Sequence, residues 1–205
     1  MTEVHLVRHG RVENPEGVLY GRLPGFGLSA EGRESALWAA RELRTMIPRL
    51  DSLRSSPLQR ALESAEPISA EFGVGIEQRD DLVEASSKLE GGRYRASLRV
   101  LRQPSVWVHL RNPFQPSWGE PFREVAERMS REVIAAARAH PDGHVVLVSH
   151  ELPIWMVHRL ATHKRLFHDP RRRRCALSSI TSLRVEGESF TEIGYRETEV
   201  FGSGR

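Results

Sequence analysis

The sequence feature that most constrains the fold is the apolar run HVVLVSH at residues 144–150. Four consecutive aliphatic residues between polar ends are typical of a strand buried on both faces, and such strands belong to parallel sheets covered by helices. A shorter run of the same kind covers residues 3–7 and ends at an Arg-His-Gly turn. These two strands favour an α/β fold.

Four segments have the apolar period and the terminal signals of helices. They begin near Ser29, Ser56-Pro57, Pro121 and Pro153 and end near Ile47, Gly73, His140 and Thr162. Ser29 can cap the first helix, and Pro48 ends it. Pro67 lies inside the second helix and should kink or split it.

Further strands are predicted near residues 50–55 and 76–84, and the end of the chain reads as a hairpin around Glu186-Gly187. Strands that alternate with helices predict an α/β domain with a largely parallel sheet and an antiparallel edge. Residues 86–119 are poor in regular pattern. We expect one domain over residues 1–205, with 86–119 as a lid or substrate wall.

Composition limits the cellular locations and the binding partners that can be expected. Cys175 is the only cysteine, so no internal disulfide can form, and a reducing cytoplasm is the simplest expectation. No apolar run approaches the roughly 20 residues that span a bilayer, and the first residues lack the apolar stretch of a secretory signal. The arginine run 171–174 is expected to be a solvated loop and not a nucleic-acid site.

The segments HLVRHG and VVLVSHE are both apolar strands that end in a histidine, His9 and His150. Because ligands collect beyond the carboxyl ends of parallel strands, we expect both histidines at one site. Arg60 lies one turn into a helix that follows another strand, and Arg8 precedes His9. Two arginines, two histidines and adjacent helix N-termini suit a phosphate dianion.

Such a cluster suggests phosphoryl chemistry. A neutral imidazole can attack phosphorus and carry the phosphoryl group covalently, while cations stabilise the charge on its oxygens. The leaving alkoxide needs a proton, so a carboxylic acid is expected nearby. Glu84 and Glu151 are both placed to supply it.

Five motifs follow one another in a familiar order: LVRHG, LSAEGRESA, SSPLQRALESA, LVEASSKLEGGRYR and VVLVSHE. In order and spacing they resemble the histidine phosphatase superfamily (phosphoglycerate mutase-like) over nearly the whole chain. The resemblance implies a three-layer α/β/α sandwich, a phosphohistidine at His9, a phosphate pocket of Arg8, Arg60 and His150, and Glu84 as the proton donor. It implies no metal and no cofactor.

The chain departs from the family pattern at several positions. Val12 and Pro15 stand where many members have Ser or Thr and Asn, and Asn14, one place early, is carried over as a candidate phosphate contact. Small residues usually follow the second histidine, whereas this chain has Glu151, which is the alternative acid as in the acid-phosphatase branch. The stretch after Glu84 lacks the mutase motif and looks like the phosphatase branch.

The expected function is therefore a metal-independent phosphomonoesterase acting on a small phosphorylated metabolite. The alternatives are a phosphoglycerate mutase-type transfer and a non-catalytic phospholigand-binding protein, the latter motivated by the departures from the pattern. Specificity is expected from residues 86–119 and from Arg11, Tyr20 and Arg22 near the pocket mouth. The substrate and the oligomeric state stay open, although the terminal hairpin offers an edge for a homodimer.

The other histidines have simpler interpretations. We expect His5 to be a hydrogen-bonded structural residue of its strand. His158, His163 and His168 lack the spacing of a zinc site, and no cysteine pair exists.

Overall fold

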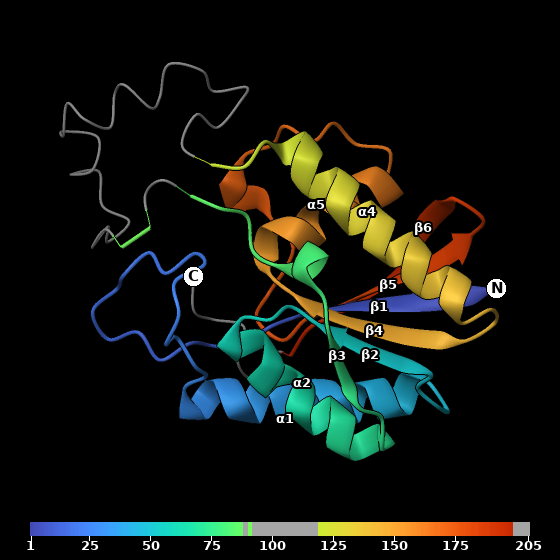
Figure 1. Cartoon of the computed structure of the whole chain (residues 1–205), viewed down its shortest axis with the longest axis horizontal. Coiled ribbons are helices and arrows are strands. Elements are labelled where there is room, and N and C mark those ends of the chain that lie inside the picture. The colour runs from blue at the N-terminus through green and yellow to red at the C-terminus, as the bar shows by residue number, and fades with distance from the viewer. Residues whose placement is uncertain (88–89, 92–118, 199–205) are drawn as a thin grey trace.

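The computed structural model describes residues 1–87, 90–91 and 119–198. Its centre is a six-stranded sheet with the strand order β3-β2-β4-β1-β5-β6 (Figure 1). The strands are β1 Thr2–Arg8, β2 Ser52–Ser55, β3 Ile76–Gln78, β4 His144–Ser149, β5 Ile180–Glu186 and β6 Ser189–Arg196. The first four are mutually parallel, and β5 and β6 pair antiparallel at one edge. The predicted sheet and its antiparallel edge are confirmed.

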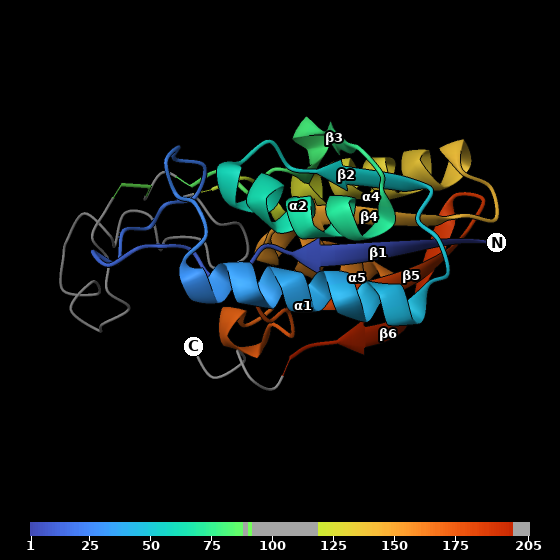
Figure 2. The same cartoon turned by 90° about the horizontal axis from the view of Figure 1, so that it is seen from below.

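Helices cover both faces of this sheet (Figures 1 and 2). They are α1 Ala30–Met46, α2 Gln59–Phe72, α4 Phe122–Ala139 and α5 Glu151–Ala161, with short 3-10 turns η1 Asp80–Leu82 and η3 Pro170–Arg172. Helices α1 and α2 pack on one face and α4 and α5 on the other. The result is the three-layer α/β/α sandwich.

The alternation of side chains along β1 and β4 explains their unbroken apolar sequence. Leu6 and Leu147 pack in the layer with α4 and α5, whereas Val7, Val146 and Val148 pack in the layer with α1 and α2. All five are at most 1 % exposed. Both faces of these strands are covered, so both need apolar side chains.

Two helix starts and the interior of one helix differ from expectation. Helix α2 begins at Gln59, two residues after Pro57, and its N-cap residue is Leu58. Pro67 was expected to kink or split this helix; it lies inside one continuous α2, so the helix is not split. Burial of the apolar face of α2 against the sheet offsets the roughly 3 kcal/mol that an interior proline costs. Helix α5 begins at Glu151, two residues early.

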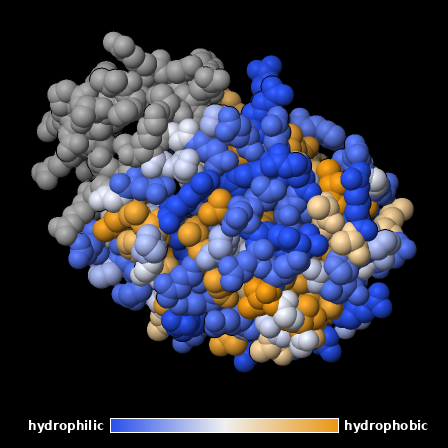
Figure 3. All heavy atoms as spheres, in the orientation of Figure 1, coloured by the Kyte–Doolittle hydropathy of each residue, from blue (hydrophilic) through white to orange (hydrophobic). Residues whose placement is uncertain are grey.

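Most of residues 86–119 lie outside the described part of the chain, so the expected lid stays a prediction. The flanks of this segment meet: Ser87 and Gly119 form an antiparallel bridge, and the Glu120 amide donates to the Ser86 carbonyl at 3.0 Å. On the face drawn in Figure 3, the hydrophobic residues lie in separate groups among hydrophilic ones. No helix within the described ranges has the length and apolarity that crossing a membrane requires.

Candidate active site

The carboxyl ends of β1, β2 and β4 bring together residues far apart in sequence. His9 follows β1, Arg60 lies in the first turn of α2, and His150 is the N-cap residue of α5. The centroids of the two imidazole rings are 5.1 Å apart, at an interplanar angle of 58°. Arg60 Nε lies 3.4 Å from His9 Nε2. The two histidines thus face each other rather than separate cavities.

The His9 ring is held in one orientation. Its Nδ1 lies 2.8 Å from the Gly10 carbonyl oxygen, which only accepts, so Nδ1 carries the proton and Nε2 holds the lone pair. Burial lowers the pKa of His9 well below its usual 6.5, and the charges of Arg60 and Arg8 lower it further. The ring is therefore neutral at neutral pH, and its Nε2 lone pair can act as a nucleophile once the contact with Arg60 is replaced.

The His150 ring is fully buried, and it is fixed by a residue that the sequence did not single out. Its Nε2 lies 2.8 Å from Ser56 Oγ, while its Nδ1 has no hydrogen-bond partner among the described residues. Burial lowers the pKa of His150 well below its usual value, and neighbouring His9 and Arg60 lower it further. Ser56 gave only the signal of a helix start.

Arg60 is 1 % exposed, and besides His9 its guanidinium contacts two residues of the loop after β1. One Nη donates to the Gly21 carbonyl at 2.7 Å, and the guanidinium lies 4.8 Å from the ring centroid of Tyr20. Burial lowers the pKa of Arg60, yet a guanidinium remains charged in proteins. Arg60 thus brings a fixed positive charge to His9 Nε2, and Tyr20 covers it as expected near the pocket mouth.

Glu151 bridges two arginines. Its Oε2 lies 3.0 Å from Arg8 Nη2, and its Oε1 lies 3.4 Å from Arg173 Nη1. Arg8 also donates to the Cys175 carbonyl. The expectation that the run 171–174 is solvated is wrong for Arg173, because folding places it at the cavity, and nothing in the run's sequence distinguishes it from its neighbours.

Glu84 follows η1 and is half-buried. Its Oε1 accepts a hydrogen bond of 2.8 Å from the Ala85 amide. Burial raises the pKa of Glu84 above its usual 4.5, although the Ala85 hydrogen bond and the charges of Arg60 and Arg8 oppose the rise. Arg22 supports this turn from outside by donating to the Glu84 carbonyl at 2.6 Å. A carboxyl with a raised pKa suits proton donation.

A cavity of about 410 Å³ opens over these residues. Among the predicted site residues it is lined by Arg8, His9, Glu84 and Glu151. Arg60 and His150 are buried next to His9 and are not among the residues that line the cavity.

Asn14 is not brought to this cavity. Its side-chain amide donates to the Val18 carbonyl at 2.9 Å and accepts from the Val18 amide at 3.0 Å. Arg11 likewise pairs with Glu31 at 3.0 Å and does not line the cavity. In this structure both residues shape the loop after β1.

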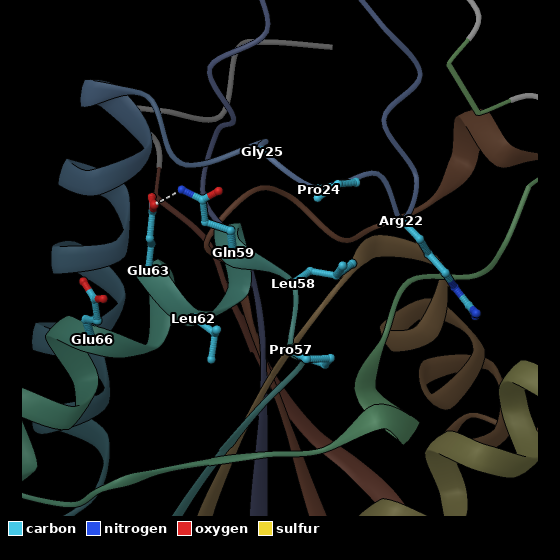
Figure 4. Close-up of a pocket in the computed structure, with 9 residues that line it drawn as sticks. All are labelled: Arg22, Pro24, Gly25, Pro57, Leu58, Gln59, Leu62, Glu63 and Glu66. Atoms are coloured by element: carbon cyan, nitrogen blue, oxygen red, sulfur yellow. Dashed lines mark hydrogen bonds between the residues drawn. The ribbon is translucent and has the colours of Figure 1, made fainter.

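A second cavity of about 460 Å³ lies beside the start of α2 (Figure 4). It is lined by two carboxylates, Glu63 and Glu66, and Figure 4 shows the Arg22 side chain directed away from them. Glu63 is further engaged by Gln59 and by the Leu28 amide. The cavity over His9 is also lined by carboxylates, but it adds Arg8, Arg173 and the His9 imidazole. No histidine is among the described residues that line the second cavity, so the cavity over His9 is the candidate active site.

Comparisons with known proteins identify the fold and the family of the chain. "Uncharacterized protein Rv0525" of Mycobacterium tuberculosis (strain ATCC 25618 / H37Rv) is 48 % identical over 199 residues, 96 % of each chain. Phosphoserine phosphatase from Entamoeba histolytica, solved with 3-phosphoglyceric acid, shares the fold at a TM-score of 0.78 and 17 % identity, covering 97 % of this chain and 98 % of that one.

A mycobacterial glucosyl-3-phosphoglycerate phosphatase, Rv2419c, solved with VO3, shares the fold at a TM-score of 0.73 and 23 % identity, covering 89 % of this chain and 92 % of that one. The sequence model of the histidine phosphatase superfamily (branch 1) matches residues 4–198. The resemblance drawn from the five motifs is confirmed by that match. The chain belongs to the histidine phosphatase superfamily, branch 1.

Proposed function

We propose that this protein is a metal-independent phosphomonoesterase that carries the phosphoryl group on His9. One observation carries the proposal: a neutral imidazole nitrogen lies 3.4 Å from a buried guanidinium and beside a second imidazole, at a cavity lined by Arg8 and Glu84. Nucleophile, anion-binding groups and acid are thus gathered within one site.

The reaction proceeds in two steps. The phosphate of the substrate replaces the contact between Arg60 and His9, and His9 Nε2 attacks phosphorus in line with the ester oxygen. The P–O bond breaks as Glu84 gives its proton to the leaving alkoxide. In the second step the Glu84 carboxylate takes a proton from water, the water oxygen attacks phosphorus, and the P–N bond breaks to release inorganic phosphate and neutral His9.

The phosphoryl oxygens are held by Arg8, Arg60 and His150. The first two supply fixed positive charge, which stabilises the oxygens most when water is excluded. His150 Nδ1 supplies a hydrogen bond, since Ser56 can donate to Nε2 and so leave the proton on Nδ1. An incoming oxygen gives this buried nitrogen the partner that it lacks among the described residues.

Glu84 is the better candidate for the acid than Glu151. Both Glu151 oxygens are engaged by guanidinium groups, from Arg8 and Arg173. Glu84 has one oxygen bonded to a backbone amide and a pKa raised by burial. Glu151 is then a positioning residue that orients Arg8.

The substrate is proposed to be a small phosphorylated metabolite. The cavity of about 410 Å³ lies within the range of small-ligand sites, roughly 300–1,000 Å³. Two similar folds belong to phosphatases named for phosphoserine and glucosyl-3-phosphoglycerate, and this supports hydrolysis over mutase transfer. A cytoplasmic location remains part of the proposal, on the ground that the chain has one cysteine.

The proposal is tested by hydrolysis of 4-nitrophenyl phosphate in the presence of EDTA. We expect turnover that the chelator leaves unchanged, that His9→Ala abolishes, and that the exposed control His163→Asn retains. A primed isomerisation assay on phosphoglycerates accompanies it. Isomerisation faster than hydrolysis would establish the mutase instead, and phosphate binding without turnover of any ester in a metabolite panel would establish a binding protein.

A further inference from the structure

At the opposite end of β1 from His9, three side chains that can ligate a metal lie on one face of the sheet. Glu3 and His5 are two residues apart on β1, so they point to the same side. His144 begins β4 and stands in register with Glu3. His9 lies four positions after His5, which places His5 about 13 Å from the active site along the strand.

The donor atoms of this cluster are close together. One donor atom each from Glu3, His5 and His144 lies within 4.8 Å of those of the other two. Glu3 Oε2 is 3.7 Å from His144 Nδ1, and the two imidazole rings are stacked with centroids 5.9 Å apart. Two imidazoles and one carboxylate from neighbouring strands thus converge.

Two nitrogens in the cluster have no hydrogen-bond partner among the described residues. His5 is 1 % exposed, and its Nδ1 lies 2.9 Å from Ser182 Oγ, which leaves Nε2 buried without a partner. His144 Nδ1 is also buried without one. Buried polar atoms nearly always have partners, so two such nitrogens on residues whose donor atoms converge point to a ligand.

We propose that Glu3, His5 and His144 form a binding site for a divalent transition-metal ion, with Zn²⁺ as the best match. Two imidazole nitrogens and a carboxylate oxygen are ligands that Zn²⁺ accepts in tetrahedral sites with water in the fourth position. Mg²⁺ and Ca²⁺ prefer all-oxygen sites and fit this set poorly.

The surroundings support the ligand set. Ser182 can accept the Nδ1 proton and leave the Nε2 lone pair for the metal, the usual outer contact of a ligating histidine. Arg184 Nη2 lies 3.4 Å from Glu3 Oε1. Its positive charge repels a bound cation, but its contact also orients the carboxylate.

The geometry needs only a modest closure. Ligand bonds of about 2.0–2.2 Å put the donor atoms of a tetrahedral site about 3.4 Å apart. The Glu3 and His144 side chains are 27 % and 23 % exposed, so both can rotate inward and an ion can reach them from solvent. Bound there, the ion ties β1 to β4, the two strands whose far ends carry His9 and His150.

This inference does not depend on the proposed phosphatase reaction, and its test separates the two. Chelator-treated, untagged protein is titrated with ZnCl2 by calorimetry, and thermal unfolding is followed with and without Zn²⁺. We expect one site and a rise in Tm on binding. His144→Ala and Glu3→Gln should each weaken binding at least tenfold, because even outer contacts of a metal site are worth 10–100-fold.

Three controls assign the site. His163→Asn removes an exposed histidine elsewhere and should bind as the wild type does; its residue has φ of 54°, which asparagine tolerates. His9→Ala should also keep the site, which excludes binding by the active-site imidazoles. His144→Ala should keep hydrolysing 4-nitrophenyl phosphate. Absence of Zn²⁺ binding by the wild type, or equal affinity in the wild type, His144→Ala and Glu3→Gln, would overturn the proposal.

Discussion

Glu84 and Glu151 both line the cavity, and their contacts divide their roles. The proton that Glu84 donates matters most when the leaving group is a poor one. We therefore expect Glu84→Gln to lower kcat/KM, which reports the first step alone, by about 10²–10⁴ for an alkyl phosphate and by much less for 4-nitrophenyl phosphate. Glu151→Gln should lower both rates alike, since it changes only the contacts of Arg8 and Arg173.

Steady-state kinetics of both variants on both substrates checks this division. Full activity of Glu84→Gln on the alkyl phosphate would reject Glu84 as the acid. A loss in Glu151→Gln that grows with the basicity of the leaving group would assign the role to Glu151.

The shifted pKa values of His9 and Glu84 set the pH dependence of catalysis. The pKa of His9 lies well below 6.5, so the nucleophile stays unprotonated in mildly acidic solution. Glu84 must hold its proton, and burial raises its pKa above 4.5. We expect kcat/KM for the alkyl phosphate to fall as pH rises through the raised pKa of Glu84, and this limb to vanish in Glu84→Gln. The wild type and Glu84→Gln are compared on the same substrate, so the titration of the substrate's phosphate affects both pH profiles equally.

At the scale of elements, two glycines let the loop after β1 lie against the start of α1. A Cβ built on Gly10 would overlap the Gly32 carbonyl oxygen, and one built on Gly32 would overlap the Arg11 carbonyl oxygen. The Gly32 amide donates to Ser29, the N-cap residue of α1, at 3.1 Å. This close approach fixes the backbone that carries His9.

We expect Gly32→Ala to destabilise the fold by about 1–3 kcal/mol, because overpacking outweighs alanine's higher helix propensity. Urea unfolding measures the loss. Gly75→Ala is the matched control, since a Cβ there meets nothing within 4 Å, and its stability should be unchanged or slightly raised. Equal stability of Gly32→Ala and the wild type would mean that the loop does not press on α1.

The elements that the sequence predicted are those with strong local signals. The Ser29 cap, the αL glycine at Gly73 and the apolar stripe of α4 each leave a pattern in the sequence, and each was placed within a residue or two. The starts of α2 and α5 were each two residues off, and each lies beside a contact between distant segments that leaves no pattern in the sequence. Ser56 bonds to the His150 ring, and His150 itself is the N-cap residue of α5.

Some residues of the site could be predicted from the sequence, and others could not. His9, Arg60 and His150 could be expected together, because each follows a parallel strand and such strand ends share one edge. Arg173 and Ser56 could not, since an arginine in a basic run and a serine before a proline have no feature that marks them as site residues. Asn14 was inferred only from its resemblance to a family position, and its side chain is bonded to Val18.

At the scale of the whole molecule, buried neutral histidines couple stability to pH. Burial lowers the pKa of His5 from 6.5 to about 4 in the folded protein. Below pH 6.5, His5 is therefore protonated in the unfolded chain but not in the folded protein. The free energy of unfolding then falls as the pH falls. His9 and His150 shift in the same direction.

We expect His5 alone to remove about 2 kcal/mol of stability between pH 7 and about pH 5. Urea unfolding of the wild type and of His5→Gln in EDTA at both pH values measures it. Between pH 7 and pH 5, the free energy of unfolding of His5→Gln should fall by about 2 kcal/mol less than that of the wild type. Identical losses would show that His5 titrates normally in the folded protein.

The central claim is that the carboxyl ends of β1 and β4 form one phosphoryl-transfer site, in which His9 carries the phosphoryl group. Rapid quenching during turnover of a ³²P-labelled phosphate monoester tests it directly. The account predicts labelled protein that is acid-labile and base-stable, as a phosphoramidate is, with the label on His9 and absent from His9→Ala. Labelled protein that resists acid, or equal labelling of His9→Ala, would contradict it.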